Sequence, residues 1–214
     1  MNILHITCSP RGRASESHRL SQRIIERLAA ESDGAAPDGA APAIVEIDAT
    51  RLPHVDQDYA LALSAPADPA DDVLNRGALR LSTELIQALQ DATHIVIATP
   101  MHNFTVPSAL KVWIDHVVRV RSTFRITAEG KIGNLPDRPV YVAVSSGGEY
   151  SGDAARQPDF LTPYLKHVLG TIGLHNVSFF SVQGTARGDA ALQAARALAE
   201  AEIAAHPLAA ASIA

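Results

Sequence analysis

Three serines stand close together directly after the first apolar run of the chain. Ser9, Ser15 and Ser17 belong to the segment SPRGRASES, which precedes a helical pattern. Hydroxyl groups and the free N–H groups of a helix start are hydrogen-bond donors, and the helix dipole favours negative charge at that end. We therefore predict a phosphate-binding loop. The alternative is structural, because Ser15 or Ser17 would cap the helix whatever else it did.

Two well-known nucleotide-binding motifs are missing from the sequence. It contains no GxGxxG, the glycine turn that lets a Rossmann fold approach a pyrophosphate. It also contains no GxxxxGK[ST], whose lysine contacts a nucleoside triphosphate. A ligand with a terminal monophosphate therefore fits the serine-rich loop better than a ligand with a pyrophosphate.

Two further segments carry groups that could contact a flat heteroaromatic ring. Residues 99–107, TPMHNFTVP, form a loop that two prolines stiffen and that contains a thioether, an aromatic ring, an amide and an imidazole. Residues 145–148, SSGG, contain paired glycines, which permit a close approach of the backbone and a nest of N–H donors. Taken singly, each segment has an ordinary alternative role, packing for the first and turning for the second.

Apolar runs predict the elements that position these loops. Five short runs rich in Val and Ile are nearly continuous, which is typical of strands buried on both faces of a parallel sheet. Helical patterns alternate with them, and this order requires right-handed crossovers and a doubly wound α/β sheet. The predicted strands are Asn2–Thr7, Ala43–Asp48, His94–Thr99, Pro139–Ser145 and Val177–Gln183. The predicted helices are Ser17–Glu31, Leu79–Asp91, Ser108–Val120, Phe160–Gly173 and Asp189–Ala205.

One domain over residues 1–214 is expected. Ser32–Pro42 and Ser64–Asp72 are rich in Ala, Pro, Asp and Gly, and we interpret them as loops within one sheet and the tail after His206 as frayed. A domain boundary near Ser64 is less favoured, because the roughly 60 residues before it would hold only two strands and one helix. Ligands of such sheets bind at the carboxyl ends of the strands, where the three segments described above lie.

Composition and charge disfavour several classes of protein. The chain has 214 residues, 47% of them hydrophobic, and a net charge of −5, which offers no electrostatic footprint for nucleic acid and no polybasic anchor for lipid. Cys8, the one cysteine, cannot form an internal disulfide and is interpreted as a buried apolar residue. The histidine spacing matches no helical metal site. We expect a cytoplasmic protein, because the first apolar run follows no basic segment and no run is long enough to span a membrane.

Together the segments resemble one family. SPRGRASES, TPMHNFTVPSALKVWIDHVVRVRSTFR, VSSGG and TPYLKHVLGTIGLHNVSFFSVQG, in this order, are similar to the FMN-dependent NADH-azoreductases of the flavodoxin-like quinone reductase group. The resemblance extends over almost the whole chain. It implies a flavodoxin-like doubly wound sheet of five parallel strands with helices on both faces. The family pattern P-M-x-N-F-x-[IV]-P-x-x-L-K is matched at Pro100, Met101, Asn103, Phe104, Val106, Pro107, Leu110 and Lys111.

The resemblance implies an enzyme with one non-covalent FMN per subunit. Two electrons would pass from NAD(P)H to a quinone or azo compound in a ping-pong cycle, within a homodimer that has its flavin sites at the interface. The flavin would carry the chemistry, so no acid–base pair is needed in the first half of the cycle. The implied contacts are Ser9, Ser15, the backbone of Glu16 and Ser17 for the phosphate, Met101, His102, Asn103 and Phe104 for the isoalloxazine, and Ser145, Ser146, Gly147 and Gly148 for the pyrimidine edge.

Three positions bear on substrate choice. His102 stands where relatives often carry Tyr, and it could be a proton donor or a merely packed or solvated side chain. Ser146 stands where some relatives carry Arg or Gly. Arg121 is expected near the mouth of the flavin site, where its guanidinium could bind the 2′-phosphate of NADPH, or on the surface beside an acidic residue.

Two other functions are weighed against this one. A flavodoxin-type electron carrier is the main alternative, but flavodoxins have Ser/Thr-x-Thr-Gly-x-Thr in the first loop and a strongly acidic surface, and this sequence has neither. A hydrolase is disfavoured, because Asp115 and His116 have no elbow serine near them in the sequence.

Overall fold

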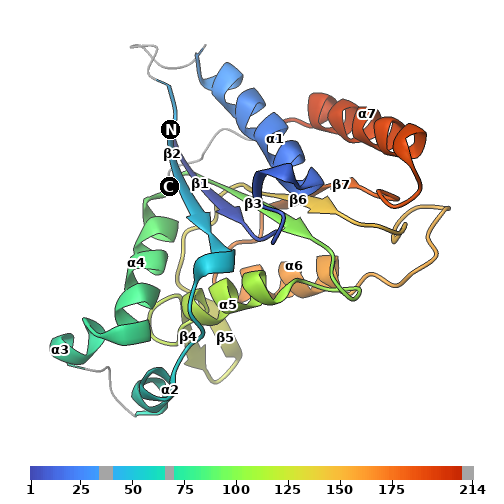
Figure 1. The fold of residues 1–214 in the computed structure, drawn as a ribbon. Coiled ribbons are helices and arrows are strands. Elements are labelled where there is room, and N and C mark those ends of the chain that lie inside the picture. Colours follow the sequence, from blue (N-terminus) through green and yellow to red (C-terminus); the bar gives the residue numbers. More distant parts are fainter. Residues whose placement is uncertain (34–40, 66–69, 209–214) are drawn as a thin grey trace.

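A five-stranded parallel sheet forms the centre of the protein (Figure 1). The computed structural model describes residues 1–33, 41–65 and 70–208. The strand order is β2-β1-β3-β6-β7, so the chain moves to one side of β1 to form β2 and to the other side to form β3. The strands span Asn2–Thr7 (β1), Ala43–Asp48 (β2), His94–Pro100 (β3), Val140–Ser145 (β6) and Val177–Val182 (β7), which confirms the five predicted strands to within a residue at each end.

Helices cover both faces of this sheet, as the doubly wound fold requires (Figure 1). One face packs against α1 and α7, and the other packs against α4, α5 and α6. Successive strand side chains point to opposite faces, so Ile3 packs with the first pair of helices and Leu4 with the other three. The helices span Glu16–Asp33 (α1), Gly77–Asp91 (α4), Ser108–Val117 (α5), Leu161–Thr171 (α6) and Asp189–Ala205 (α7).

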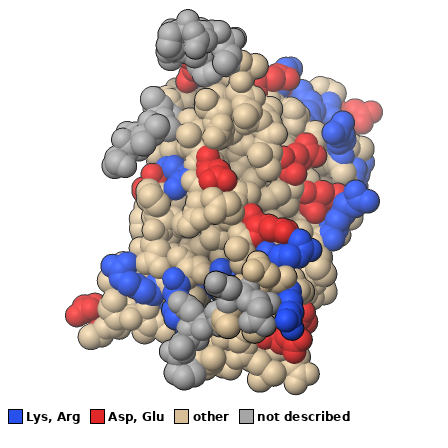
Figure 2. Space-filling view, turned by 90° about the vertical axis from the view of Figure 1, so that its left-hand side faces the viewer, with Lys and Arg blue, Asp and Glu red and all other residues tan. Residues whose placement is uncertain are grey.

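β2 departs from the prediction of strands buried on both faces. It lies at the edge of the sheet, and its Ile44 and Val45 are 49% and 53% exposed. The inner strands β1, β3 and β6 are almost completely buried. Figure 2 views the molecule from the side of β2 and α4, and there acidic and basic side chains are interspersed over a largely uncharged surface. The apolar run predicted the strand correctly but not its edge position, which the topology decides.

Several elements lie outside the predicted set. They are α2 (Gln57–Ser64), α3 (Asp71–Leu74), the antiparallel strands β4 (Phe124–Thr127) and β5 (Gly130–Gly133), and two short 3-10 helices, η1 (Gly12–Ala14) and η2 (Ala49–Arg51). The prediction of a loop over Ser64–Asp72 is therefore wrong at its end, where α3 begins. No helix in the described part of the chain is long and apolar enough to cross a membrane.

Some predicted boundaries are also corrected. α1 continues to Asp33, so the loop predicted from Ser32 begins later, and α5 ends at Val117 instead of Val120. The remainder of the first predicted loop (34–40), part of the second (66–69) and the end of the tail (209–214) lie outside the described residues.

A buried histidine joins β1 to α1. The His5 side chain is fully buried, and its Nε2 lies 2.9 Å from the hydroxyl oxygen of Ser21 on α1. Its Nδ1 lies 3.8 Å from the carboxylate of Glu46 on β2, and the His18 ring of α1 lies 5.7 Å away. Burial lowers the pKa of His5 to about 4, because the opposing effect of Glu46 is smaller than the cost of desolvating the imidazolium.

This shift makes the stability of the protein depend on pH. Between pH 6.5 and about 4 the unfolded chain binds a proton at His5 that the folded chain does not, so the free energy of unfolding falls as the pH is lowered through this window. A shift of this size corresponds to about 3 kcal/mol. Urea unfolding at several pH values measures the slope. His5→Gln should flatten it, and an unchanged slope in that variant would contradict the assignment.

Candidate functional site

The loop after β1 combines a short 3-10 helix with the start of α1. Ser15 Oγ accepts a hydrogen bond from the backbone N–H of His18 at 3.2 Å, and it donates to the carbonyl of Gly12 at 2.9 Å. Ser15 therefore caps α1, as the structural alternative predicted. Ser9 Oγ accepts from the N–H of Arg11 at 3.2 Å. These contacts fix the loop without using all of its donors.

Two backbone donors remain at the start of α1. Among the described residues, no acceptor meets the amides of Glu16 and Ser17, as is usual in the first turn of a helix. The side chains of Ser9, Ser15 and Ser17 are all buried around this turn, with the last two hydroxyl oxygens 3.4 Å apart. Free amides, nearby hydroxyls and the positive end of an 18-residue helix suit a bound anion.

The loop after β3 contains a tight two-residue turn. His102 and Thr105 exchange two backbone hydrogen bonds of 3.0 Å, and Asn103 and Phe104 between them have φ angles of +49° and +71°. This is the conformation of a type I′ turn, in which Asn is common and Phe is not. The left-handed conformation costs a residue such as Phe about 1–2 kcal/mol. Strain of this kind is typical of functional sites.

The loop after β6 turns its carbonyl groups toward the protein. The carbonyls of Ser146, Gly147 and Gly148 accept hydrogen bonds from N–H groups of residues 184–186, at 3.0 to 3.4 Å. The amides of the two glycines donate to no acceptor within the described residues. A Cβ at Gly147 would meet only Ala186, at an ordinary 3.7 Å, so internal packing does not require glycine there. The bare backbone leaves room for a flat ligand.

Gln157 links these last two loops and was not predicted from the sequence. Its Nε2 donates to the hydroxyl of Ser146 at 3.1 Å and approaches the sulfur of Met101 at 3.3 Å. Its Oε1 occupies the space beside Gly148, where a Cβ would lie only 2.6 Å away. No motif marks Gln157 in the sequence, because its position depends on the path of the loop between β6 and α6.

One cavity of about 420 Å³ brings the three loops together at the carboxyl ends of β1, β3 and β6. Ser17 and Ser146 are buried outside its lining, and Phe104 is 46% exposed. Asn103 and Gly148 do not line it either. The predicted residues in its wall are Ser9, Ser15, Glu16, Met101, His102, Ser145 and Gly147, and the wall also contains Pro10, Arg11, Pro100, Thr185 and Leu192, which were not predicted.

A larger cavity of about 630 Å³ lies elsewhere, beside the first residues of β1 and β2 and against α4. It contains none of the predicted site residues. Parallel α/β sheets bind their ligands at the carboxyl ends of the strands, so we assign the site to the smaller cavity. Among the described residues, no group of three or more His, Cys, Asp or Glu side chains could hold a metal ion.

Two further residues considered in the sequence do not line the cavity. Cys8 is fully buried, and desolvation raises the pKa of its thiol far above the usual range, in agreement with its interpretation as an apolar residue. Arg121 does not line the cavity, and its guanidinium donates a hydrogen bond of 3.3 Å to the carbonyl of Ala65, just after α2. The interpretation of Arg121 as a ligand of the 2′-phosphate of NADPH stays a prediction.

The fold and the cavity are those of a doubly wound, mononucleotide-binding class of protein. The strand order reverses between β1 and β3, and the cavity lies at their carboxyl ends, where doubly wound proteins bind mononucleotides. The model of a family described as having a flavodoxin-like fold matches residues 1–206.

Curated relatives place the chain more closely. An FMN-dependent NADH:quinone oxidoreductase 4 from Pseudomonas fluorescens is 44% identical over 209 residues, 97% of this chain and 96% of the relative. An FMN-dependent NADH:quinone oxidoreductase 5 from Burkholderia lata is 46% identical over 195 residues, 91% of each chain. A crystal structure of an FMN-dependent NADH-azoreductase from Bacillus anthracis, in complex with FMN, has a TM-score of 0.72 and 25% identity over 95% of this chain and 97% of the other. The chain belongs to the flavodoxin-like family that contains these proteins.

The strained turn provides a test of the geometry of the site. Alanine normally stabilises a protein more than glycine does, but at a φ of +71° the order should reverse. We expect Phe104→Gly to be more stable than Phe104→Ala by about 1 kcal/mol, because both variants lose the ring and only the glycine relieves the backbone. The midpoints of urea unfolding measure this difference. An alanine variant of equal or greater stability would contradict the left-handed turn.

Proposed function

We propose that this protein is an FMN-dependent oxidoreductase that transfers two electrons from NADH or NADPH to quinones or azo compounds, within one flavodoxin-like domain. The observation that carries the proposal is the convergence on one cavity of three loops, each of which keeps a pair of unused backbone amides. The relatives named above support both the cofactor and the reaction.

The donors of the first loop fit a terminal phosphate. A phosphate monoester has oxygen acceptors and no positive group, and the amides of Glu16 and Ser17 are donors that lack an acceptor among the described residues. The hydroxyls of Ser9, Ser15 and Ser17 lie beside these amides. We assign the phosphate of FMN to this loop, where hydrogen bonds to a charged group contribute about 1.5–3 kcal/mol each.

The other two loops fit the two sides of a flavin ring. Met101 to Phe104 would lie against the isoalloxazine, and the amides of Gly147 and Gly148 would donate to the pyrimidine edge. When bound, FMN supplies hydride acceptance and donation, and negative charge gathers at that edge on reduction. Fixed amide dipoles stabilise such charge without having to reorganise.

The side chains of the site position and shield the reactants. Gln157 ties the loop of Met101 to the loop of Ser146 and keeps the two walls at a fixed separation. His102 lines the cavity and is exposed, so it would contact the second substrate. Hydride transfer from the nicotinamide needs no protein proton, so the role of this chain is orientation and the exclusion of water.

Direct reduction by the nicotinamide tests the proposal. The purified protein with FMN should lose its visible flavin absorbance when NADH is added without any partner reductase. NADH and a benzoquinone should use the same cavity in turn, so initial rates should give parallel double-reciprocal lines. Intersecting lines across a series of quinones would contradict the ping-pong cycle. A flavin that NADH leaves oxidised would favour the alternative, a flavodoxin-type electron carrier.

We also propose that the protein is a homodimer with the second subunit beside the cavity. Phe104 and Phe160 are 46% and 58% exposed, and the backbone N–H of Phe160 donates to the carbonyl of Phe104 at 3.0 Å. Exposed aromatic residues whose backbones lie side by side next to a binding site are typical of an interface core. The expected symmetry is two-fold, the commonest arrangement of identical subunits.

Sedimentation velocity at assay concentrations should show a dimer. Phe160→Asp should shift the protein toward monomer, because it places a charge in the proposed apolar interface. Leu198→Asp is a matched control, since Leu198 is 63% exposed on α7, away from these rings. A fully active monomer, or equal dissociation in both variants, would contradict this interface.

A further inference from the structure

Glu16 places a carboxylate in a cavity that otherwise suits an anion. Its backbone amide is one of the free donors at the start of α1, and the residue lines the cavity together with Ser9 and Ser15. A phosphate held by these donors would lie near the Glu16 side chain. Two negative charges close together in a partly buried site repel each other unless a cation intervenes.

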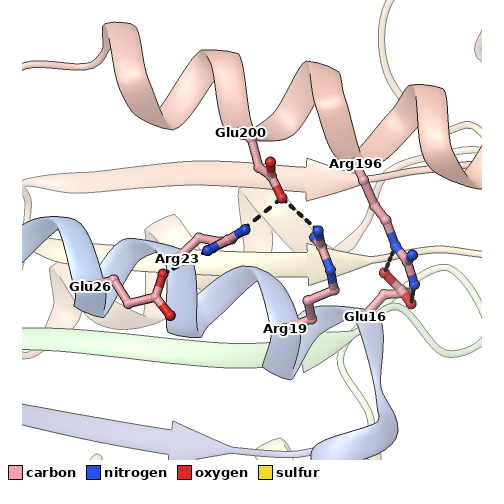
Figure 3. Close-up of polar contacts among 6 residues, drawn as sticks. All are labelled: Glu16, Arg19, Arg23, Glu26, Arg196 and Glu200. Carbon is pink, nitrogen blue, oxygen red and sulfur yellow. Dashed lines mark hydrogen bonds and ion pairs between the residues drawn. The ribbon is translucent and has the colours of Figure 1, made fainter.

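Arg196 of α7 supplies the cation that is bonded to this carboxylate, and Arg11 and Arg19 add weaker attraction from further away. The Nε and Nη2 of Arg196 donate to the two carboxylate oxygens of Glu16 at 2.8 and 2.5 Å, so the pair is bidentate (Figure 3). The side chains are 16% exposed for Glu16 and 23% exposed for Arg196. The hydrogen bonds from Arg196 lower the pKa of Glu16, so the carboxylate is ionised at neutral pH. Fork-to-fork pairing of this kind holds both side chains in one orientation.

The remaining ion pairs between α1 and α7 do not reach the cavity. Arg19 and Arg23 of α1 both contact the carboxylate of Glu200, at 2.6 and 3.5 Å, and Arg23 also bonds Glu26 at 2.9 Å (Figure 3). None of these residues lines the cavity. These ion pairs also hold α1 and α7 together. Variants of these residues can therefore distinguish a loss of helix docking from a loss of the charge that neutralises Glu16.

We propose that Arg196 is a positioning residue for the phosphate of FMN, which it serves by neutralising the Glu16 carboxylate and turning it away from the phosphate donors. The inference rests on the proposed function, because it concerns the same cofactor site. Arg196 acts through Glu16 and not by direct contact with the phosphate. The two residues are therefore coupled: loss of Arg196 should weaken FMN binding only while residue 16 carries a charged carboxylate.

The test compares Arg196→Gln, Glu16→Gln and the double variant by titration of FMN against the apoprotein, with flavin fluorescence as the readout. Arg196→Gln should weaken FMN binding about tenfold or more, because it exposes an unpaired carboxylate to the phosphate. Glu16→Gln should bind FMN at least as tightly as the wild type. The double variant should return to within about threefold of the wild type, since it has no carboxylate to neutralise.

Riboflavin serves as a second probe, because it has the same ring and no phosphate. Arg196→Gln should change riboflavin affinity less than about twofold. Arg23→Gln is the control for net charge, and Glu200→Gln is the control for docking of α7 on α1; both should leave FMN affinity within about twofold. Thermal unfolding of each apoprotein reports any general loss of folding.

The possible failures are distinct. A wild-type protein that binds neither FMN nor riboflavin would overturn the proposed function itself. Normal FMN binding by Arg196→Gln would overturn only the role of Arg196. A double variant as weak as Arg196→Gln, or equal losses for FMN and riboflavin, would show that Arg196 acts on the fold or on the ligand directly, and it would also overturn the proposal.

Discussion

The hydrogen-bond ladder at the carboxyl ends of the strands is the constraint on which the site depends. Pro100 pairs with Ser145 at the end of β3 and β6, and the ladder continues one step further, from the N–H of Met101 to the carbonyl of Ser145 at 2.8 Å. The N–H of Cys8 donates in the same way to Ala98 at 2.9 Å, which ties the end of β1 to β3. The three loops therefore begin at the same level, and side chains far apart in the sequence line one cavity.

The pattern of backbone hydrogen bonds also decides which donors are left for a ligand in the cavity. Each loop uses most of its polar groups internally, through a helix cap, a two-residue turn or the contacts of residues 184–186. The amides of Glu16 and Ser17, of Asn103 and Phe104, and of Gly147 and Gly148 are among those that donate to no acceptor within the described residues. Asn103, Phe104 and Gly147 are exposed, so their amides can donate to water when no ligand is bound. A ligand rich in acceptors at both ends can replace that water, and a flavin mononucleotide has this character.

Local patterns predicted the strands, the helices that cover them and the three loops, because buried parallel strands and helix starts have strong sequence signatures. The edge position of β2 was not predictable from its apolar run. The β4–β5 hairpin was missed because its strands are short and mostly exposed. Gln157 and Arg196 were missed for another reason: they reach the site from distant elements, and no local motif records a contact across 180 residues, as between Glu16 and Arg196.

The charged and polar groups that line the cavity behave differently from the buried titratable groups beneath it. The cavity presents amide dipoles and the Glu16 carboxylate, whose pKa is lowered, so this carboxylate stays ionised around neutral pH. His5 and Cys8 lie in or directly after β1, below the phosphate loop, and burial shifts their pKa values so that both are neutral there. Protonation of His5 therefore acts on the packing of β1 against α1, whereas the backbone amides that α1 presents do not titrate. The cavity therefore keeps its hydrogen-bond donors as long as α1 stays folded.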